Sequence, residues 1–331
     1  MFCPHRALDL TYTAGAVYQE GLTMNTDKGS GQSLNAIREP ALRRTWLFGP
    51  GADTQAHQAM ADSGADALIV DLEDFTPPAR RAEARAMLPA LLAGWRARAR
   101  VLVVRVNPLE GEGGLDLAAA MPARPDVIAL PMASGAEQIL ALDRAITAHE
   151  QALGFVDGSI EILPVCETAL GVVEVRAMAR ASHRVRCALL GAEDLAADLC
   201  AERGPDGLEL DHARRRFVLE CRAAGIEPVD APYTWSDVDG AVREARVARR
   251  LGYRSKSLVR PDHAEALNRA LTPDELERRH AQAIVTAFEQ ARSRGEDRAL
   301  VNGQWVEVQT WRNAQRLLER AQWLADADAS G

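Results

Sequence analysis

From residue 45 onward, the chain alternates between short apolar runs and longer amphipathic stretches. Each run consists of β-branched and aliphatic residues and ends in polar residues or glycine. Some runs, such as residues 101–104, are apolar without alternation, which is typical of strands buried on both faces of a parallel sheet. The eight runs are residues 46–51, 67–74, 101–107, 127–133, 161–168, 186–195, 227–233 and 253–259.

This repeated pattern predicts an α/β fold. Eight strand-and-helix units fit a closed parallel barrel, so we expect a (β/α)8 barrel, the TIM-barrel fold. The alternative is an open, doubly wound parallel sheet, which usually has a glycine-rich phosphate-binding turn after its first strand. Gly49-Pro50-Gly51 ends the first predicted strand and is not such a turn. The barrel is therefore favoured over the open sheet.

The beginning of the chain differs from the repeating part. Residues 26–33 are polar and rich in glycine and serine, a composition that favours disorder over packing. We therefore expect residues 1–40 to form a disordered tail. The barrel is expected over residues 41–270 and a small extension over residues 271–331.

The predicted extension contains three elements. A helix is expected over residues 272–294, because its first turn holds a proline and acidic residues. A hairpin is expected over residues 299–308, around Asn302-Gly303, and a final helix over residues 310–324. We expect these elements to be too few for a core of their own. The extension would then pack on the barrel or on a neighbouring subunit.

Charge and cysteine content exclude several classes of protein. The formal net charge is −8, whereas a nucleic-acid-binding face is basic. The five cysteines form no CxxC pair, which is typical of reduced thiols in a cytoplasmic protein. No apolar run approaches the roughly 18 residues of a membrane helix, and no secretion signal is recognisable. We therefore expect a cytoplasmic protein that binds neither nucleic acid nor a membrane.

Polar residues at the carboxyl ends of the predicted strands are the candidates for chemistry, because active sites of this fold lie there. Asp71 and Glu73 end the second strand, Arg105 the third and Glu167 the fifth, and the sixth runs into Asp194. These are carboxylates with one arginine and no histidine. An all-oxygen ligand set selects hard cations, above all Mg²⁺, and the spacing of the histidines does not suggest zinc.

Two of these carboxylates form the predicted metal site. Glu167 and Asp194 lie on adjacent predicted strands at matching depth, so their side chains are expected to converge on one ion. Arg105 would face this ion across the barrel mouth, where its planar guanidinium suits a carboxylate or an enolate oxygen.

Each candidate also has a purely structural alternative. Asp71 and Glu73 could cap a helix or pair with nearby arginines, and Glu167 and Asp194 could favour a helix N-terminus. Lys256 could form a buried ion pair. For Asp71 and Glu73, the possible ion-pair partners are Arg80, Arg81 and Arg85. We also expect His263 to lie on a helix surface and Cys166 to be a packing residue.

Ordered sequence blocks carry a resemblance to a known family. The most specific blocks are ETALGV at residues 167–172 and GAEDLAADL at residues 191–199. Shorter blocks include LFGPG at residues 47–51, DLED at 71–74 and VRVN at 104–107. Together they resemble the citrate lyase β-subunit-like family of the aldolase/acyl-CoA lyase superfamily.

The resemblance implies a barrel that assembles into homotrimers or larger homo-oligomers such as hexamers. It implies Mg²⁺ bound by Glu167 and Asp194, with Arg105 on a carbonyl or carboxylate oxygen of the substrate. An enolate would form as a carbon–carbon bond breaks, and backbone N–H groups of Gly191 and Ala192 would bind the distal carboxylate. The expected substrate is a CoA thioester of a hydroxy-dicarboxylic acid, of the citryl-CoA or malyl-CoA type.

Some positions depart from the family pattern. Met132 stands where the family usually has lysine, and Arg260 replaces a histidine. Glu307 takes the place of an aspartate that, in relatives, reaches a neighbouring active site as acid or base, and Gln309 replaces a later proline. These departures keep two alternatives open: an aldolase on a free 2-oxo acid without CoA, and a partner-dependent subunit of a larger lyase.

A CoA-binding site would need basic residues near the barrel rim. The candidates are Arg43, Arg44, Arg80 and Arg81.

Overall fold

The computed structural model describes residues 38–98 and 100–329, so the predicted disordered tail lies almost wholly outside the described residues. Within them, eight parallel strands form a closed barrel in the order β1-β2-β3-β4-β5-β6-β7-β8. The first and last strands close the barrel, in a register that pairs Thr45 with Lys256 and Leu47 with Leu258. The prediction of a (β/α)8 barrel is confirmed, and the alternative of an open sheet is wrong.

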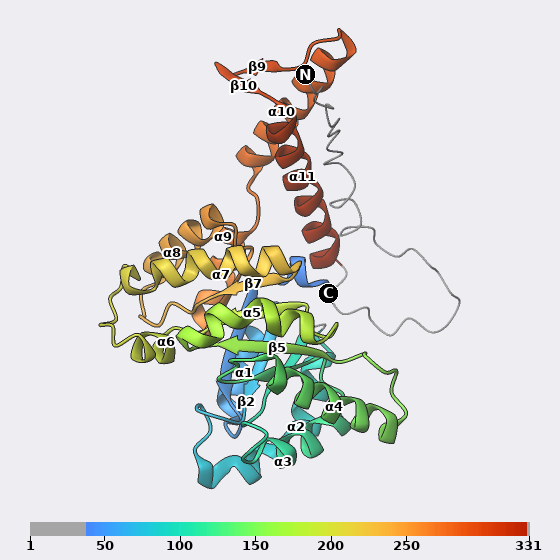
Figure 1. Cartoon of the computed structure of the whole chain (residues 1–331), viewed down its shortest axis with the longest axis vertical. Helices are drawn as coiled ribbons and strands as arrows, with labels where there is room; N and C mark the ends of the chain where they lie inside the picture. Colours follow the sequence, from blue (N-terminus) through green and yellow to red (C-terminus); the bar gives the residue numbers. More distant parts are fainter. Residues whose placement is uncertain (1–37, 99, 330–331) are drawn as a thin grey trace, which may run out of the picture. The chain divides into compact units, whose positions relative to one another are not determined.

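Helices alternate with the strands along the chain and surround them in space (Figure 1). The strands are β1 (Thr45–Pro50), β2 (Ala67–Asp71), β3 (Val101–Arg105), β4 (Val127–Leu130), β5 (Glu161–Cys166), β6 (Cys187–Leu190), β7 (Glu227–Asp230) and β8 (Ser255–Leu258). The helices are α1 (Thr54–Asp62), α2 (Arg81–Arg96), α3 (Gly113–Ala120), α4 (Ala136–Leu153), α5 (Ala169–Ala181), α6 (Glu193–Asp198), α7 (Asp211–Ala224), α8 (Val238–Leu251) and α9 (Ala264–Leu271). Among the described residues, no helix combines the length and apolar character needed to span a membrane.

In strands β1 to β6, alternate residues contribute to two separate apolar cores, because side chains in a strand point to opposite faces in turn. The inner core fills the barrel and includes Trp46 and Val165. The outer core joins strands to helices and includes Leu68 and Cys166, so the prediction that Cys166 is a packing residue is confirmed. Because Val165 faces inward, the same alternation directs Glu167 toward the interior at the carboxyl end of β5.

The extension forms the predicted helix, hairpin and helix. These elements are α10 (Glu275–Ser293), β9 (Ala299–Val301), β10 (Gln304–Val306) and α11 (Val308–Ala329). Asp274 caps α10, accepting from the N–H of Glu277 while the Glu277 side chain accepts from the N–H of Asp274. The hairpin turns at Asn302 and Gly303, whose φ angles are +50° and +76°. Positive φ at both positions is what a two-residue hairpin turn of type I′ requires.

Our expectation that the extension has no core of its own is wrong. A compact cluster joins α10, the hairpin and α11, and includes Ala281, Ile284, Val285, Phe288, Ala291, Ala299, Val306 and Ala314. The extension also contacts the barrel: the Arg320 Nη1 donates to the carbonyl oxygen of Leu271 at 2.9 Å. A second contact is the ion pair between Arg44 Nη2 and Asp328 Oδ1 at 2.8 Å. Packing on a neighbouring subunit stays a prediction.

Lys256 belongs to a buried ionic network between the barrel wall and α7 and α8. Its Nζ lies 2.8 Å from Asp230 Oδ2 and 3.1 Å from Glu244 Oε2, and the side chain is fully buried. Arg214 of α7 binds the same Asp230 carboxylate at 2.7 Å. The structural alternative for Lys256, a buried ion pair, is therefore confirmed.

His263 corrects a further expectation. We expected this residue on a helix surface, but only 1% of it is exposed. Its Nε2 lies 3.3 Å from the carbonyl oxygen of Ser236, and its ring lies 6.3 Å from that of Tyr233. His263 is the last residue of the 3-10 helix η5 (Pro261–His263), which leads the chain from β8 into α9.

Candidate active site

Arg105 and Asp71 form the centre of the site at the barrel mouth. The two residues end neighbouring strands and face each other in the β2–β3 register. Arg105 Nε donates to Asp71 Oδ1 at 2.9 Å, and Nη2 donates to Oδ2, so the contact is bidentate. The guanidinium lies over the ring of Phe48, 5.2 Å from its centroid. These contacts fix the plane of the guanidinium. Only 4% of the Arg105 residue is exposed to solvent.

Asp71 is itself held by the backbone that follows β2. Its Oδ1 accepts from the N–H of Glu73 at 2.8 Å, and its Oδ2 accepts from the N–H of Phe75 at 3.1 Å. Asp71 thus anchors Arg105 instead of pairing with Arg80, Arg81 or Arg85.

Those arginines have other partners, so the predicted alternative in which they pair with Asp71 and Glu73 is wrong. Arg80 pairs with Glu83 at 2.8 Å, and Arg85 pairs with Asp116 at 2.9 Å. Arg81 lies 3.4 Å from an oxygen of Glu112.

Glu73 adds a second carboxylate beside Arg105. Its Oε2 lies 2.9 Å from Arg105 Nη1. Burial raises the pKa of Glu73 to about 7, repulsion from Asp74 and Asp71 adds to the increase, and the charge of Arg105 opposes it. A carboxyl group that titrates near neutrality can both accept and donate a proton at physiological pH.

Glu167 lies at the end of β5 and is 4% exposed. Its Oε1 accepts a hydrogen bond from the N–H of Met132 at 2.7 Å. Burial raises the pKa of Glu167 to about 7, with repulsion from Asp194 and Glu73 adding to the increase. The hydrogen bond from Met132 and the charge of Arg105 oppose this change. The structure therefore brings Asp194, Glu73 and Arg105 within electrostatic range of Glu167.

The prediction that Asp194 lies on the sixth strand is wrong, because β6 ends at Leu190. Asp194 lies in the first turn of α6, as its structural alternative stated, and it is exposed to solvent. Within the part of the chain that the structure describes, no group of three or more His, Cys, Asp or Glu side chains is arranged as a metal cage. Mg²⁺ does not need one, because it usually binds one or two protein carboxylates and keeps waters or substrate oxygens as its other ligands. Glu167 and Asp194 supply two such carboxylates, and a cation between them would relieve their mutual repulsion.

Gly191 and Ala192 lie where β6 leads into α6. The N–H of Gly191 donates to the carbonyl oxygen of Cys166 at 3.0 Å. This N–H is one of the two predicted to bind a substrate carboxylate, and it is already used in a hydrogen bond between β5 and the end of β6. A Cβ atom at Gly191 would lie 2.4 Å from Glu167 Cβ. This position therefore accepts only glycine while Glu167 keeps its conformation.

The basic residues proposed for a CoA-binding rim divide into two groups. Arg43 pairs with Glu161, the first residue of β5, at 2.6 Å, and Arg44 binds Asp66, which precedes β2, at 2.9 Å. Both therefore lie at the amino ends of the strands, away from the mouth. The prediction that Arg43 and Arg44 belong to a CoA-binding rim is wrong. Arg80 and Arg81 follow β2 on the side of the mouth and remain candidates.

Glu307 lies in the extension, between β10 and α11, and its side chain is exposed. Its carbonyl oxygen accepts from the N–H of Trp311 at 3.0 Å. A role for Glu307 as acid or base in a neighbouring active site stays a prediction.

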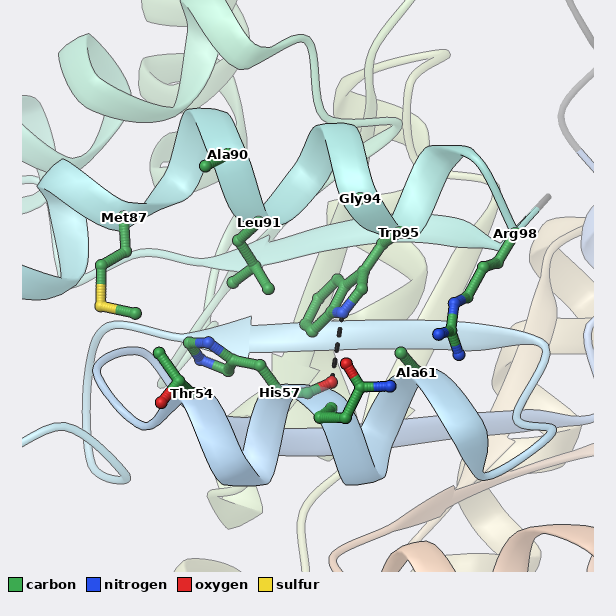
Figure 2. Close-up of a pocket in the computed structure, with 10 residues that line it drawn as sticks. Thr54, His57, Ala61, Met87, Ala90, Leu91, Gly94, Trp95 and Arg98 are labelled. Carbon is green, nitrogen blue, oxygen red and sulfur yellow. Dashed lines mark hydrogen bonds between the residues drawn. The ribbon is translucent and has the colours of Figure 1, made fainter.

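Two cavities lie among the strands and helices of the barrel. One, of about 330 Å³, lies between α1 and α2, where Trp95 Nε1 donates to the carbonyl oxygen of His57 at 3.4 Å (Figure 2). It contains none of the predicted site residues. The other, of about 50 Å³, adjoins the site and is lined by Pro108, Leu109, Glu110, Leu130, Pro131, Met132, Gln138 and Ala141.

Sequence reasoning missed two features of the site. Phe48 supports the Arg105 guanidinium, and the backbone of Met132 adopts the left-handed conformation, with φ of +49°, while its N–H binds Glu167. The alternation of side chains along β1 could have placed Phe48 inside the barrel. No signal in the sequence marks a methionine for a left-handed conformation, which glycine and asparagine adopt far more often.

Comparisons with known proteins agree with this architecture. The profile of the HpcH/HpaI aldolase/citrate lyase family matches residues 44–261. Citrate lyase subunit beta of Haemophilus influenzae is 34% identical over 85% of this chain and 97% of its own length. L-malyl-CoA/beta-methylmalyl-CoA lyase of Cereibacter sphaeroides is 30% identical over 85% of this chain and 95% of its own length. The protein CitE of Mycobacterium tuberculosis, solved with magnesium, acetoacetate and coenzyme A, is 26% identical, with a TM-score of 0.66 over 84% of this chain and 98% of that one.

Proposed function

The chain belongs to the HpcH/HpaI aldolase/citrate lyase family and is a carbon–carbon lyase, and we propose that it cleaves a CoA thioester of a hydroxy-dicarboxylic acid with the help of Mg²⁺. The proposed substrates are of the citryl-CoA or malyl-CoA type. One observation carries the proposal: Arg105, fixed by Asp71, lies within electrostatic range of the buried Glu167 at the barrel mouth. This arrangement suits a reaction in which negative charge develops on a substrate oxygen.

Glu167 and Asp194 are the proposed Mg²⁺ ligands. When bound, the metal would act as a Lewis acid on the substrate carbonyl. Two observations support the assignment: the buried Glu167 carboxylate has Asp194 and Glu73 as acidic neighbours, and both proposed ligands are oxygen donors. The proposal agrees with the magnesium in the solved complex of CitE from Mycobacterium tuberculosis.

Arg105 is the proposed binding group for the oxygen that becomes negative as the carbon–carbon bond breaks to give an enolate. Asp71 and Phe48 hold its guanidinium before substrate arrives, so little reorganisation is needed during the reaction. Most of this residue is removed from water, and a fixed positive charge stabilises a developing anion more strongly there than in bulk solvent.

Glu73 is the proposed proton-transfer group that the same chain contributes at its barrel mouth. Its pKa of about 7 lets it exchange a proton with the substrate near neutral pH. We propose Glu307 as a second acid or base, which a neighbouring subunit of a homotrimer or hexamer would contribute. The N–H of Ala192 is the proposed contact for the distal carboxylate of the substrate.

A turnover assay on the purified full-length chain tests this function. Citryl-CoA, malyl-CoA and free 2-oxo acids would each be offered with and without Mg²⁺. Arg105→Lys is expected to lower kcat/KM about 100- to 1000-fold, because lysine cannot reproduce the bidentate, stacked guanidinium. Arg294→Lys is the control, since this exposed arginine pairs only locally with Glu296 at 2.9 Å.

The same assay separates the alternatives. Turnover of free 2-oxo acids alone would exclude a CoA thioester as the substrate and favour the hypothesis of an aldolase that acts without CoA. Activity that appears only after other subunits are added would favour the hypothesis of a partner-dependent subunit. The departures at Met132, Arg260 and Glu307 motivate that hypothesis, and a relative named as a lyase subunit agrees with it. Equal activity of wild type and Arg105→Lys would refute the role of Arg105.

A further inference from the structure

Backbone groups on two sides constrain the Glu167 side chain. On one side, the N–H of Met132 donates to Oε1 at 2.7 Å. On the other side, Gly191 leaves room for the side chain, because a Cβ at this position would lie 2.4 Å from Glu167 Cβ and 3.2 Å from Oε2. Oε1 is therefore occupied by the β4 side of the barrel, and Oε2 lies toward the β6 side, where the chain continues to Asp194.

The left-handed conformation of Met132 is imposed by its surroundings. A positive φ, here +49°, is uncommon for a residue with a side chain. The next residue is pinned to β5, because the N–H of Ala133 donates to the carbonyl oxygen of Val165 at 3.0 Å. Gly171 then closes over this loop, since a Cβ at Gly171 would lie 2.4 Å from the carbonyl oxygen of Ala133. With the loop held in this way, the N–H of Met132 points at Glu167.

We infer that Met132 and Gly191 are positioning residues that hold Glu167 so that a single oxygen, Oε2, is presented to Mg²⁺. The inference rests on the metal site of the proposed function and goes beyond it, because it assigns the coordinating oxygen and the groups that select it. Mg²⁺ demands near-ideal octahedral geometry, which a single, well-placed carboxylate oxygen satisfies more easily than both oxygens of one carboxylate. Groups that orient a metal ligand typically change metal affinity 10- to 100-fold when they are altered.

Calorimetric titration of Mg²⁺ into the full-length chain tests the inference without any need for turnover. Gly191→Ala introduces the overlapping methyl group and is expected to weaken Mg²⁺ binding about 10- to 100-fold. Its matched control is Gly114→Ala, since a Cβ at Gly114 of α3 would meet no atom within 4 Å.

Two substitutions at Met132 separate its backbone from its side chain. Met132→Val is expected to weaken Mg²⁺ binding about tenfold or more, because a β-branched residue strongly disfavours positive φ and would move the N–H away from Oε1. Met132→Gly removes the same side chain but tolerates positive φ, so it should bind Mg²⁺ within about threefold of wild type. Rescue by glycine is not expected of a residue that merely fills space.

The outcomes distinguish this inference from the proposed function. If wild type binds Mg²⁺ and both Gly191→Ala and Met132→Val bind it equally well, the positioning role is refuted and the metal site stands. If Met132→Gly loses as much affinity as Met132→Val, the side chain and not the backbone matters, and the inference fails for Met132. If wild type binds no Mg²⁺, the proposed metal site fails, and the inference fails with it. Far-ultraviolet circular dichroism and the melting temperature of each variant would accompany every titration, so that loss of the fold is recognised.

Discussion

Glu167→Gln replaces a buried carboxylate by an uncharged amide of almost the same shape, which still has an oxygen to accept from the N–H of Met132. Burial raises the pKa of Glu167 from 4.5 to about 7, with repulsion from Asp194 and Glu73 adding to the increase. In the unfolded chain these causes are absent. Between pH 4.5 and pH 7, the folded chain therefore holds a proton at Glu167 that the unfolded chain has released.

The size of the effect follows from this difference in pKa. An increase of about 2.5 units (7 − 4.5) corresponds to about 3 kcal/mol, since one unit is worth about 1.4 kcal/mol. A group whose pKa is raised by folding contributes stability that is fully present below its unfolded pKa and is lost as the pH rises through its folded pKa. The stability of Glu167→Gln relative to wild type should therefore increase by about 3 kcal/mol between pH 4 and pH 8.

Urea denaturation of the full-length proteins in EDTA, at several pH values between 4 and 8, measures this difference. Glu83→Gln is the control, because Glu83 is exposed and a hydrogen bond from Arg80 lowers its pKa. A constant difference between wild type and Glu167→Gln across this pH range would refute the reasoning. If Mg²⁺ binds at Glu167, adding it in place of EDTA should restore part of the wild-type stability at pH 8, because a bound cation favours the ionised carboxylate.

Three further outcomes follow from individual contacts. Lys256→Met should lower the free energy of unfolding by about 3–5 kcal/mol, because it leaves Asp230 with one cation fewer in a buried network; urea denaturation showing a loss under 1 kcal/mol would contradict this. Asp71→Asn should lower kcat/KM about 100-fold, because it weakens the bidentate anchor of Arg105. Its Mg²⁺ affinity, measured by calorimetry, should stay within a few fold of wild type, and unchanged turnover would argue against the anchor. Gly303→Ala should cost about 1 kcal/mol at the hairpin, where φ is +76°, and a thermal melt with no shift would show that the turn adapts.

The barrel was predictable from sequence because its signal is repeated. Eight apolar runs, separated by amphipathic stretches, leave few architectures that bury every strand on both faces. The ends of the strands were less predictable. The runs at residues 67–74 and 101–107 extend beyond β2 and β3, because their last polar residues lie in the loops that form the mouth. The core of the extension was missed because its apolar residues are spread over two helices and a hairpin.

The candidate site was only partly predictable. The type of residue and its place at a strand end indicated Arg105, Glu73, Glu167 and Asp194. The structure places Arg105, Glu73 and Asp194 within electrostatic range of Glu167. Which carboxylate anchors the arginine depends on strand register, which the sequence does not state. The backbone of Met132 was beyond reach for a different reason: its conformation is set by packing of the loop against β5 and α5, and not by local propensity.

Barrel closure has a consequence for how the chain is made. Leu47 of β1 pairs with Leu258 of β8, a separation of 211 residues (258 − 47). A ribosome that adds roughly 5–20 residues per second needs about 10–40 s to cover that distance. During this time one side of β1 has no partner strand, and its open N–H and C=O groups can pair with other chains. Newly made chains should therefore aggregate most readily just before β8 emerges, and chaperones that bind exposed strands should raise the yield of folded protein.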